Sequence, residues 1–249
     1  MIKRSVAAVL CTALLIGAAG CAGWFGKKDE KTASELAEEG SAYFADEKYR
    51  KAIETYEKLR DWYPYSQFIK TAELGIADAH YSLEEYEQAL TAYEYYERMH
   101  PGDSKTPYVI YRIGMCHYER IKSIDRSQVQ TQKALETFTR LRSRFPESKY
   151  SQKAEPKIKE CRQQLAGHEF YVGRFYFKSG KYEAALGRFE GLIENYPDIK
   201  EYRQEAKDYI KRCKENLKDP DAEDEDSFRR PKGPGGTAPD SGPGMMRDQ

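Results

Sequence analysis

The stretch GSAYFADEKYRKAIETYEKLRDWYP, residues 40–64, decides the fold because its pattern returns further along the chain. Its marker residues stand at spacings of 3, 9, 4 and 8: Gly40, Tyr43, Ala52, Tyr56 and Pro64. The same spacings occur in residues 77–101 and 173–197. Residues 114–146 repeat them with a second gap of 17 in place of 9, so that copy carries an eight-residue insertion around residues 123–129. Self-similarity of this kind indicates stacked structural repeats.

Each copy predicts two antiparallel helices joined by a short turn such as ADEKY, residues 45–49. Small residues, Gly40 on the first helix and Ala52 on the second, let the two backbones approach, and the aromatic residues fill the space between neighbouring helices. The closing proline ends the second helix because it has no backbone N–H to donate. The pattern resembles the tetratricopeptide repeat, whose helix pairs stack because one pair cannot bury its apolar face alone. We expect an all-α tetratricopeptide-repeat superhelix of about four to five helix pairs.

The repeats divide residues 32–217 into helix pairs near 33–66, 67–103, 104–148 and 149–198, followed by a capping helix over 199–217. The fourth pair is longer than the others. Its extra residues, 151–166, are charged and helix-forming apart from Pro156, which fits the first turn of a helix. We therefore expect one long first helix in this pair, bent near Gly167.

The two ends differ from the repeats in composition. Residues 1–20 have the layout of a signal peptide: Lys3 and Arg4, then an apolar run too short to span a bilayer, then small residues. Residues 18–21, AAGC, resemble a bacterial lipobox, which predicts lipidation of Cys21 and a polar tether over 21–31. Ordinary signal cleavage, leaving Cys21 a free thiol, is the alternative. Residues 218–249, acidic and then rich in Gly and Pro, predict a disordered tail.

The charge distribution and the cysteines limit the kinds of partner and site that the chain can have. Charged residues make up 33% of the chain and the net charge is zero, with an acidic excess in residues 29–97 and a basic excess in residues 120–162. An exported protein is not expected to use the basic stretch on nucleic acid; a solvated helix face, lipid headgroups or an acidic partner are the readings left open. Cys116, Cys161 and Cys213 form no metal motif, and we expect buried thiols, with one disulfide as the alternative.

No catalytic constellation stands out. The sequence has no nucleophile elbow, phosphate-binding glycine loop or zinc spacing, so we expect neither an enzyme nor a cofactor or metal site. The first helices of the repeats predict a concave wall, and its candidate residues are mostly apolar or aromatic: Phe44, Leu74, Asp78, Tyr81, Tyr108, Tyr111, Met115 and Tyr118. Such a wall suits an extended apolar or aromatic peptide. The alternative is that some of these tyrosines pack against the next repeat.

Several longer stretches resemble one family. They are YPYS at 63–66, DRS at 125–127, ALETFTRLRSRFPESKYS at 134–151 and LAGHEFYVGRFYFKSGKYEAALGRFEGLIENYPD at 165–198. Together with the lipobox and the long fourth helix, they resemble the BamD family of lipoproteins from the outer-membrane β-barrel assembly machinery. The resemblance covers about residues 30–217 and leaves the tail unexplained.

The resemblance implies a scaffold that is lipid-anchored at the periplasmic face of the outer membrane and helps to recognise, fold and insert outer-membrane proteins. Its implied partners are unfolded outer-membrane proteins, a BamA-like β-barrel protein with POTRA domains, and other assembly lipoproteins. Arg188 and Glu190 fall on the family's docking helix. A tetratricopeptide-repeat adaptor for cell division or cell-wall enzymes remains the main alternative, and an accessory subunit of an envelope enzyme is another.

Overall fold

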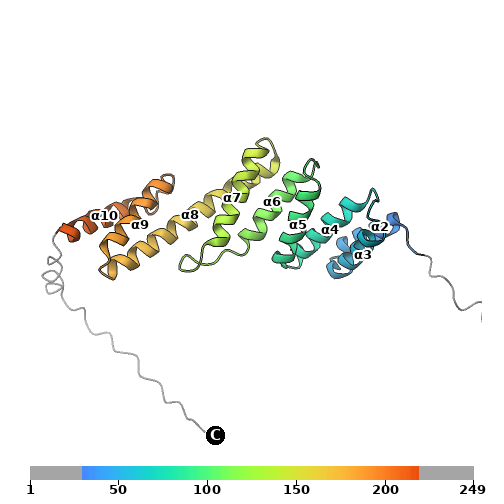
Figure 1. Ribbon diagram of the computed structural model, residues 1–249, viewed down its shortest axis with the longest axis horizontal. Coiled ribbons are helices and arrows are strands. Elements are labelled where there is room, and N and C mark those ends of the chain that lie inside the picture. The colour runs from blue at the N-terminus through green and yellow to red at the C-terminus, as the bar shows by residue number, and fades with distance from the viewer. Residues whose placement is uncertain (1–29, 219–249) are drawn as a thin grey trace, which may run out of the picture. The chain divides into compact units, whose positions relative to one another are not determined.

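The computed structural model describes residues 30–218, and all regular secondary structure in that range is α-helical (Figure 1). The all-α prediction is therefore confirmed. The predicted signal peptide, Cys21, nearly all of the tether and the tail beyond Lys218 lie outside the described residues. Within residues 30–218, no helix has the length and apolar character needed to cross a bilayer. The chain divides into two compact units, with the boundary between Cys116 and His117, and each unit is described by itself.

The first unit is built from α2 (Ala33–Ala45), α3 (Tyr49–Trp62), α4 (Ile69–Ser82), α5 (Tyr86–Met99) and most of α6 (Thr106–Tyr118). Consecutive helices from α2 to α5 pack on one another. A capping box starts α2: the Glu35 N–H donates to the Thr32 hydroxyl, and the Thr32 N–H donates to the Glu35 carboxylate at 2.7 Å. These bonds satisfy backbone donors that have no partner inside the helix.

Tyr56 on α3 explains why glycine stands in the first helix of a pair. A Cβ atom added to Gly40 on α2 would lie 2.5 Å from the Tyr56 ring, and one added to Gly75 on α4 would meet the opposite edge of the same ring. The ring is buried, and its hydroxyl lies 3.1 Å from the Ser41 hydroxyl. The glycines thus make room for an aromatic ring, whereas the sequence suggested that they only bring two backbones together.

The second unit contains α7 (Val129–Arg144), α8 (Lys149–Lys178), α9 (Tyr182–Asn195) and α10 (Arg203–Lys218). The long first helix predicted for the fourth pair is confirmed as α8, which has 30 residues. The position expected for Pro156 is wrong, because α8 begins seven residues earlier, after its Ser148 cap, and Pro156 lies inside the helix. Pro156 and Gln152, whose carbonyl loses its usual donor, are both exposed, so water can replace the missing bond.

Aromatic packing closes the end of the second unit. Phe189 on α9 is fully buried and lies against Gly173 of α8, where an added Cβ would be 2.8 Å from the ring. The Phe189 ring also stacks on Tyr209 of α10, with ring centroids 4.9 Å apart and an interplanar angle of 11°. The predicted final helix is therefore present, and it covers the α8–α9 core.

Among the described residues, Cys116, Cys161 and Cys213 are buried thiols outside any disulfide, as the sequence favoured. Burial raises the pKa of the Cys161 thiol to about 12. The equivalent turns of three helix pairs place one residue in the left-handed region: Glu47, Glu84 and Gly180, with φ of 58°, 60° and 69°. Glycine adopts this conformation without steric cost, so the two glutamates are the strained members of the set.

Candidate functional site

The predicted wall residues are distributed over both units, and each is partly exposed. Phe44 lies on α2, where it packs on the α2–α4 core and meets Tyr49 edge-on, apart from the other candidates. Leu74 and Tyr81 on α4, and Tyr108 on α6, pack on the core shared by α4, α5 and α6. Packing therefore accounts for part of the surface of these three side chains. Tyr118 belongs to the second unit and is described below.

Asp78 is the centre of the wall in the first unit. Two phenol groups donate to its Oδ1 atom: that of Tyr93 on α5 at 2.5 Å and that of Tyr108 on α6 at 2.6 Å. One carboxylate oxygen thus joins three consecutive helices. A carboxylate that is mostly buried requires such donors, because an unsatisfied charge in an apolar interior is costly.

Arg112 completes this group, although the sequence reasoning did not select it. Its guanidinium carbon lies 4.0 Å from the centroid of the Tyr81 ring, and its Nε atom donates to the Tyr108 hydroxyl at 2.9 Å. The same Nε is 4.0 Å from Asp78 Oδ1. The signal available in the sequence was that Arg112 is the only Lys, Arg, Asp or Glu in α6, TPYVIYRIGMCHY. A lone charge on an apolar helix needs partners from its neighbours.

The electrostatics of this group keep its tyrosines protonated. Burial raises the pKa of Asp78, and the hydrogen bonds from Tyr108 and Tyr93 together with the charge of Arg112 act in the opposite direction. Burial and the Asp78 charge raise the pKa of both Tyr93 and Tyr108. The phenols therefore act as fixed hydrogen-bond donors. The side chain of Arg112 stays 25% exposed, so the wall presents aromatic surface with a cation at its edge.

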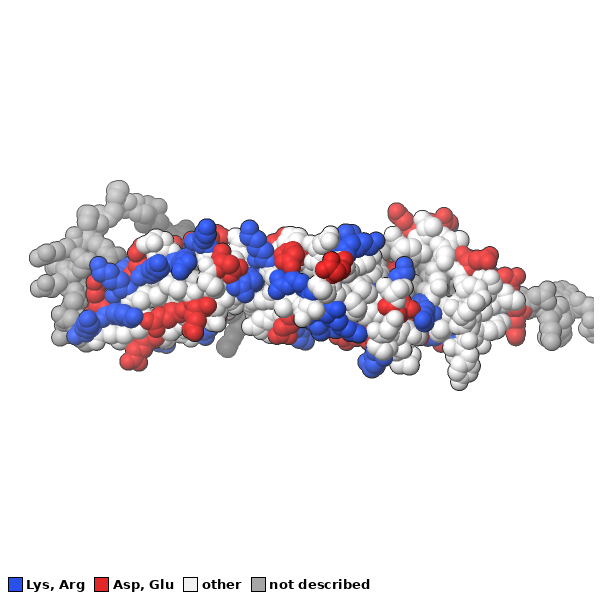
Figure 2. All heavy atoms as spheres, turned by 90° about the horizontal axis from the view of Figure 1, so that it is seen from above, with Lys and Arg blue, Asp and Glu red and all other residues white. Residues whose placement is uncertain are grey.

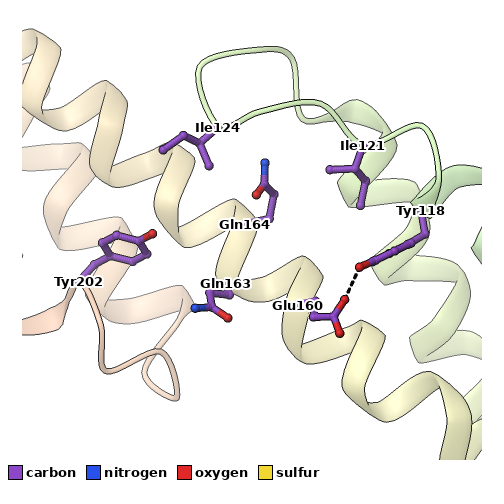
Figure 3. Close-up of a pocket in the computed structure, with 7 residues that line it drawn as sticks. All are labelled: Tyr118, Ile121, Ile124, Glu160, Gln163, Gln164 and Tyr202. Atoms are coloured by element: carbon purple, nitrogen blue, oxygen red, sulfur yellow. Dashed lines mark hydrogen bonds between the residues drawn. The ribbon is translucent and has the colours of Figure 1, made fainter.

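Tyr118, at the end of α6, takes part in a different arrangement (Figure 3). Its hydroxyl donates to the Glu160 carboxylate, and Lys157 donates to both groups at 3.2 and 3.0 Å. Beside them, a hollow is lined by α8, by Tyr202 and by the insertion that follows α6. The insertion is fastened to α8, since Gln164 donates to the Lys122 carbonyl at 2.8 Å and His168 Nδ1 donates to the Ile124 carbonyl at 2.5 Å. The hollow is therefore explained by the way the insertion packs on α8.

Arg188 and Glu190 lie on the exposed face of α9. Arg188 Nη1 donates to the Glu169 carboxylate of α8 at 3.0 Å and is 43% exposed, while Glu190 pairs with Lys214 of α10 at 2.8 Å. Arg188 lines a shallow hollow between α8 and α9 together with Gly187 and other residues: Glu169, Tyr176, Glu183, Ala184, Gly191, Asn195 and Tyr196. A Cβ added to Gly187 would meet no atom within 4 Å. The α9 face around Arg188 is thus exposed and shallow, with charged side chains at its edge.

No group of three or more His, Cys, Asp or Glu side chains among residues 30–218 is arranged to hold a metal ion.

Comparison with known proteins adds an independent result. A model of the family YfiO, described as outer membrane lipoprotein, matches residues 29–227. The outer membrane protein assembly factor BamD of Caulobacter vibrioides is 30% identical over 184 residues, which cover 72% of this chain and 60% of that protein. BamD of Rickettsia prowazekii is 30% identical over 181 residues, covering 71% and 70%. BamD of Neisseria gonorrhoeae is 31% identical over 147 residues, covering 55% of each. The chain thus spans 60% or less of the Caulobacter and Neisseria relatives.

Two solved structures are similar at a lower level. The TPR2AB domain of yeast Sti1 in its pHSP90 complex has a TM-score of 0.41 and 18% identity, covering 72% of this chain and 70% of that one. A thermophilic TPR protein of Thermus thermophilus, TTC0263, has a TM-score of 0.40 and 15% identity, covering 72% and 99%.

Proposed function

The chain belongs to the YfiO family of outer membrane lipoproteins, and on this premise we propose that it is a non-catalytic scaffold for outer membrane protein assembly. The BamD relatives, which carry the name of outer membrane protein assembly factors, support this proposal. In it, lipidated Cys21 holds the protein at the periplasmic face of the outer membrane. Two or more acyl chains are sufficient for stable anchoring.

The Asp78–Arg112 group is the observation that carries the binding step. Tyr81 and Tyr108 give the wall aromatic surface, and Arg112 places a positive charge beside them. An extended segment of an unfolded outer membrane protein would lay apolar or aromatic side chains on the rings, and Arg112 would attract a carboxylate. Because no bond is made or broken, the segment leaves when a partner binds it better.

Peptide binding tests this step. The probe is a fluorescent ten-residue peptide that ends in Phe, prepared with a free and with an amidated C-terminus, and the readout is fluorescence anisotropy. Tyr81→Ala and Tyr111→Ala should each weaken binding about fivefold, since an aromatic contact contributes about 1 kcal/mol. Arg112→Gln should remove the preference for the free carboxylate. Tyr65→Ala is the matched control, because Tyr65 is fully exposed and lies outside the wall. Equal affinities of all variants would contradict the proposal.

The α9 face is proposed as the docking surface for a BamA-like β-barrel protein with POTRA domains and for other assembly lipoproteins. Arg188 is held by Glu169 but keeps nearly half of its surface exposed, so it can contact an acidic partner without being reoriented. The bare backbone at Gly187 and Gly191 would let a partner approach α9 closely.

Affinity capture from detergent-solubilised envelopes tests the docking step. The wild-type chain should recover a POTRA-bearing β-barrel protein in near-equal amount, and Arg188→Glu should lose most of it. Arg142→Glu is the control, since Arg142 forms a comparable exposed ion pair with Glu155 of α8 at 3.3 Å. Recovery of division or cell-wall proteins without the barrel protein would favour the adaptor alternative.

A further inference from the structure

A stripe of basic side chains runs along α10, and one of them, Lys214, pairs with Glu190 of the α9 face. The stripe consists of Arg203, Lys207, Lys211, Lys214 and Lys218, all exposed. Their spacings of 4, 4, 3 and 4 place them within an arc of about 80° at about 100° per residue. The opposite side of α10 is buried, because Ala206, Cys213 and Tyr209 pack on α8 and α9. Basic side chains are visible in rows at the α10 end of the molecule, at the left of Figure 2, with acidic side chains beside them.

The fold neutralises the basic stripe only in part. Among the described residues, two of its five members have an acidic partner: Lys214 pairs with Glu190 of α9 at 2.8 Å, and Lys211 lies 3.8 Å from Glu215. All four of these side chains are about half exposed or more, so solvent and salt screen both pairs. The stripe therefore retains a net positive charge.

The complementary charge follows directly in the chain. Residues 219–226, DPDAEDED, contain six acidic residues and begin immediately after Lys218, the last residue of α10. Pro220 cannot continue a helix, and it disfavours helical backbone at Asp219.

The length of the acidic segment also matches the length of the basic stripe. Lys207 and Lys218 are 11 residues apart, which corresponds to about 16 Å along a helix axis. After a two-residue turn, the remaining six residues of the acidic segment extend over about 20 Å. An acidic segment that runs back along α10 therefore reaches every member of the stripe from Lys218 to Lys207.

We propose that residues 219–226 fold back on α10 and bind its basic stripe as an intramolecular cover. The acidic segment is tethered at the end of the stripe, so its effective concentration there is about millimolar, well above that of a free competitor. An anionic membrane would be repelled by the same six acidic residues. Any other anionic partner of α10 must first displace the cover. This proposal does not depend on the proposed function.

Zero-length cross-linking of the full chain with a carbodiimide tests the cover, because this reagent joins a Lys amine to a carboxylate only where the two are in contact. Mass spectrometry should find links between residues 219–226 and Lys207 or Lys211 at a yield comparable to the Lys214–Glu190 link, which serves as the internal standard. Raising NaCl from 50 to 500 mM should lower the yield of the tail links at least threefold, since the Debye length shortens.

Two controls test whether the links form within one chain and whether the acidic segment covers the stripe. A mixture of unlabelled and nitrogen-15-labelled chains separates links within one chain from links between chains. Changing all six acidic residues of 219–226 to Asn or Gln should increase binding to heparin, used as a polyanion probe, at least threefold. Adding Lys207→Gln and Lys211→Gln should reverse that gain, whereas Lys133→Gln and Lys159→Gln should not. Links that form only between chains, no tail links beside a normal Lys214–Glu190 link, or a heparin gain insensitive to Lys207 and Lys211 would each overturn the proposal.

Discussion

Gly173 and Gly187 make a matched pair for testing how the aromatic core is built. Both glycines lie inside helices, where alanine is more favourable than glycine by about 1 kcal/mol through helix propensity alone. A Cβ at Gly187 meets no atom within 4 Å, and Gly187→Ala should therefore raise the free energy of unfolding by about that amount. A Cβ at Gly173 would lie 2.8 and 2.9 Å from two atoms of the Phe189 ring.

The Phe189 ring has no room to move away from that Cβ. It stacks on Tyr209 at 4.9 Å and meets Phe170 edge-on at 5.7 Å. Overpacking of this kind costs about 1–3 kcal/mol. Gly173→Ala should therefore be less stable than Gly187→Ala by about 1–3 kcal/mol. Adding Phe189→Leu to Gly173→Ala should recover at least about 1 kcal/mol of the loss in a double-mutant cycle.

The assay must report on the second unit. Both tryptophans of the chain, Trp24 and Trp62, precede Cys116, so tryptophan fluorescence would follow the wrong part of the protein. Hydrogen exchange of peptides from α8 and α9, measured by mass spectrometry across a urea series, follows the relevant helices. Equal stability of the Gly173→Ala and Gly187→Ala variants would refute the idea that glycine is required by the ring.

Three further outcomes follow from the structure. Burial raises the pKa of Asp78 above its ordinary value of 3.8. Between pH 3.8 and the raised pKa, the Asp78 carboxyl is therefore more protonated in the folded state than in the unfolded state. The free energy of unfolding falls as pH rises through this range. Asp78→Asn should therefore gain stability relative to the wild type with rising pH, measured by urea unfolding from pH 4 to 8; a constant difference would contradict the assignment. The Cys161 thiol, with a pKa of about 12, should react with Ellman's reagent at pH 8 only when the protein unfolds, and rapid labelling of Cys161 in the native chain, located by peptide mass spectrometry, would count against its burial. Gly187→Ala should lower recovery of the barrel partner severalfold while it stabilises the fold, and undiminished recovery would exclude close approach at that point.

The helices were predictable because proline and aromatic residues recur at fixed spacing. The spacing alone could not show what the glycines do, since the contact of Tyr56 with both Gly40 and Gly75 joins helices from two successive pairs. Pro156 was misplaced for a local reason: proline favours the first turn of a helix. The Ser148 cap starts α8 earlier, and solvent accepts the unpaired carbonyl.

Asp78 and the aromatic residues of the candidate site were predictable from the sequence, but its cation, Arg112, was not. Periodicity selected Asp78, Tyr81 and Tyr108, and all three do lie together. Arg112 follows Tyr111 in the sequence and was not among the positions assigned to the wall. It reaches the wall because a long side chain can cross from α6 to the ring of Tyr81 on α4. Pairings between helices that are not consecutive depend on how the repeats stack, which a one-dimensional pattern does not contain.

α8 also has a mechanical consequence. Its 30 residues form a rod of about 45 Å, whose first part holds α7 through the Ser151 hydroxyl and the Leu141 carbonyl and whose last part holds α9 through Gly173 and Phe189. A force applied to α9 is therefore transmitted to α7 along one continuous helix. The weakest point of this helix is the turn that ends at Pro156, where one backbone hydrogen bond is missing. The bending stiffness of the rod is lowest there, so a load on the α9 face would flex α8 next to α7 and leave the aromatic core around Phe189 undeformed.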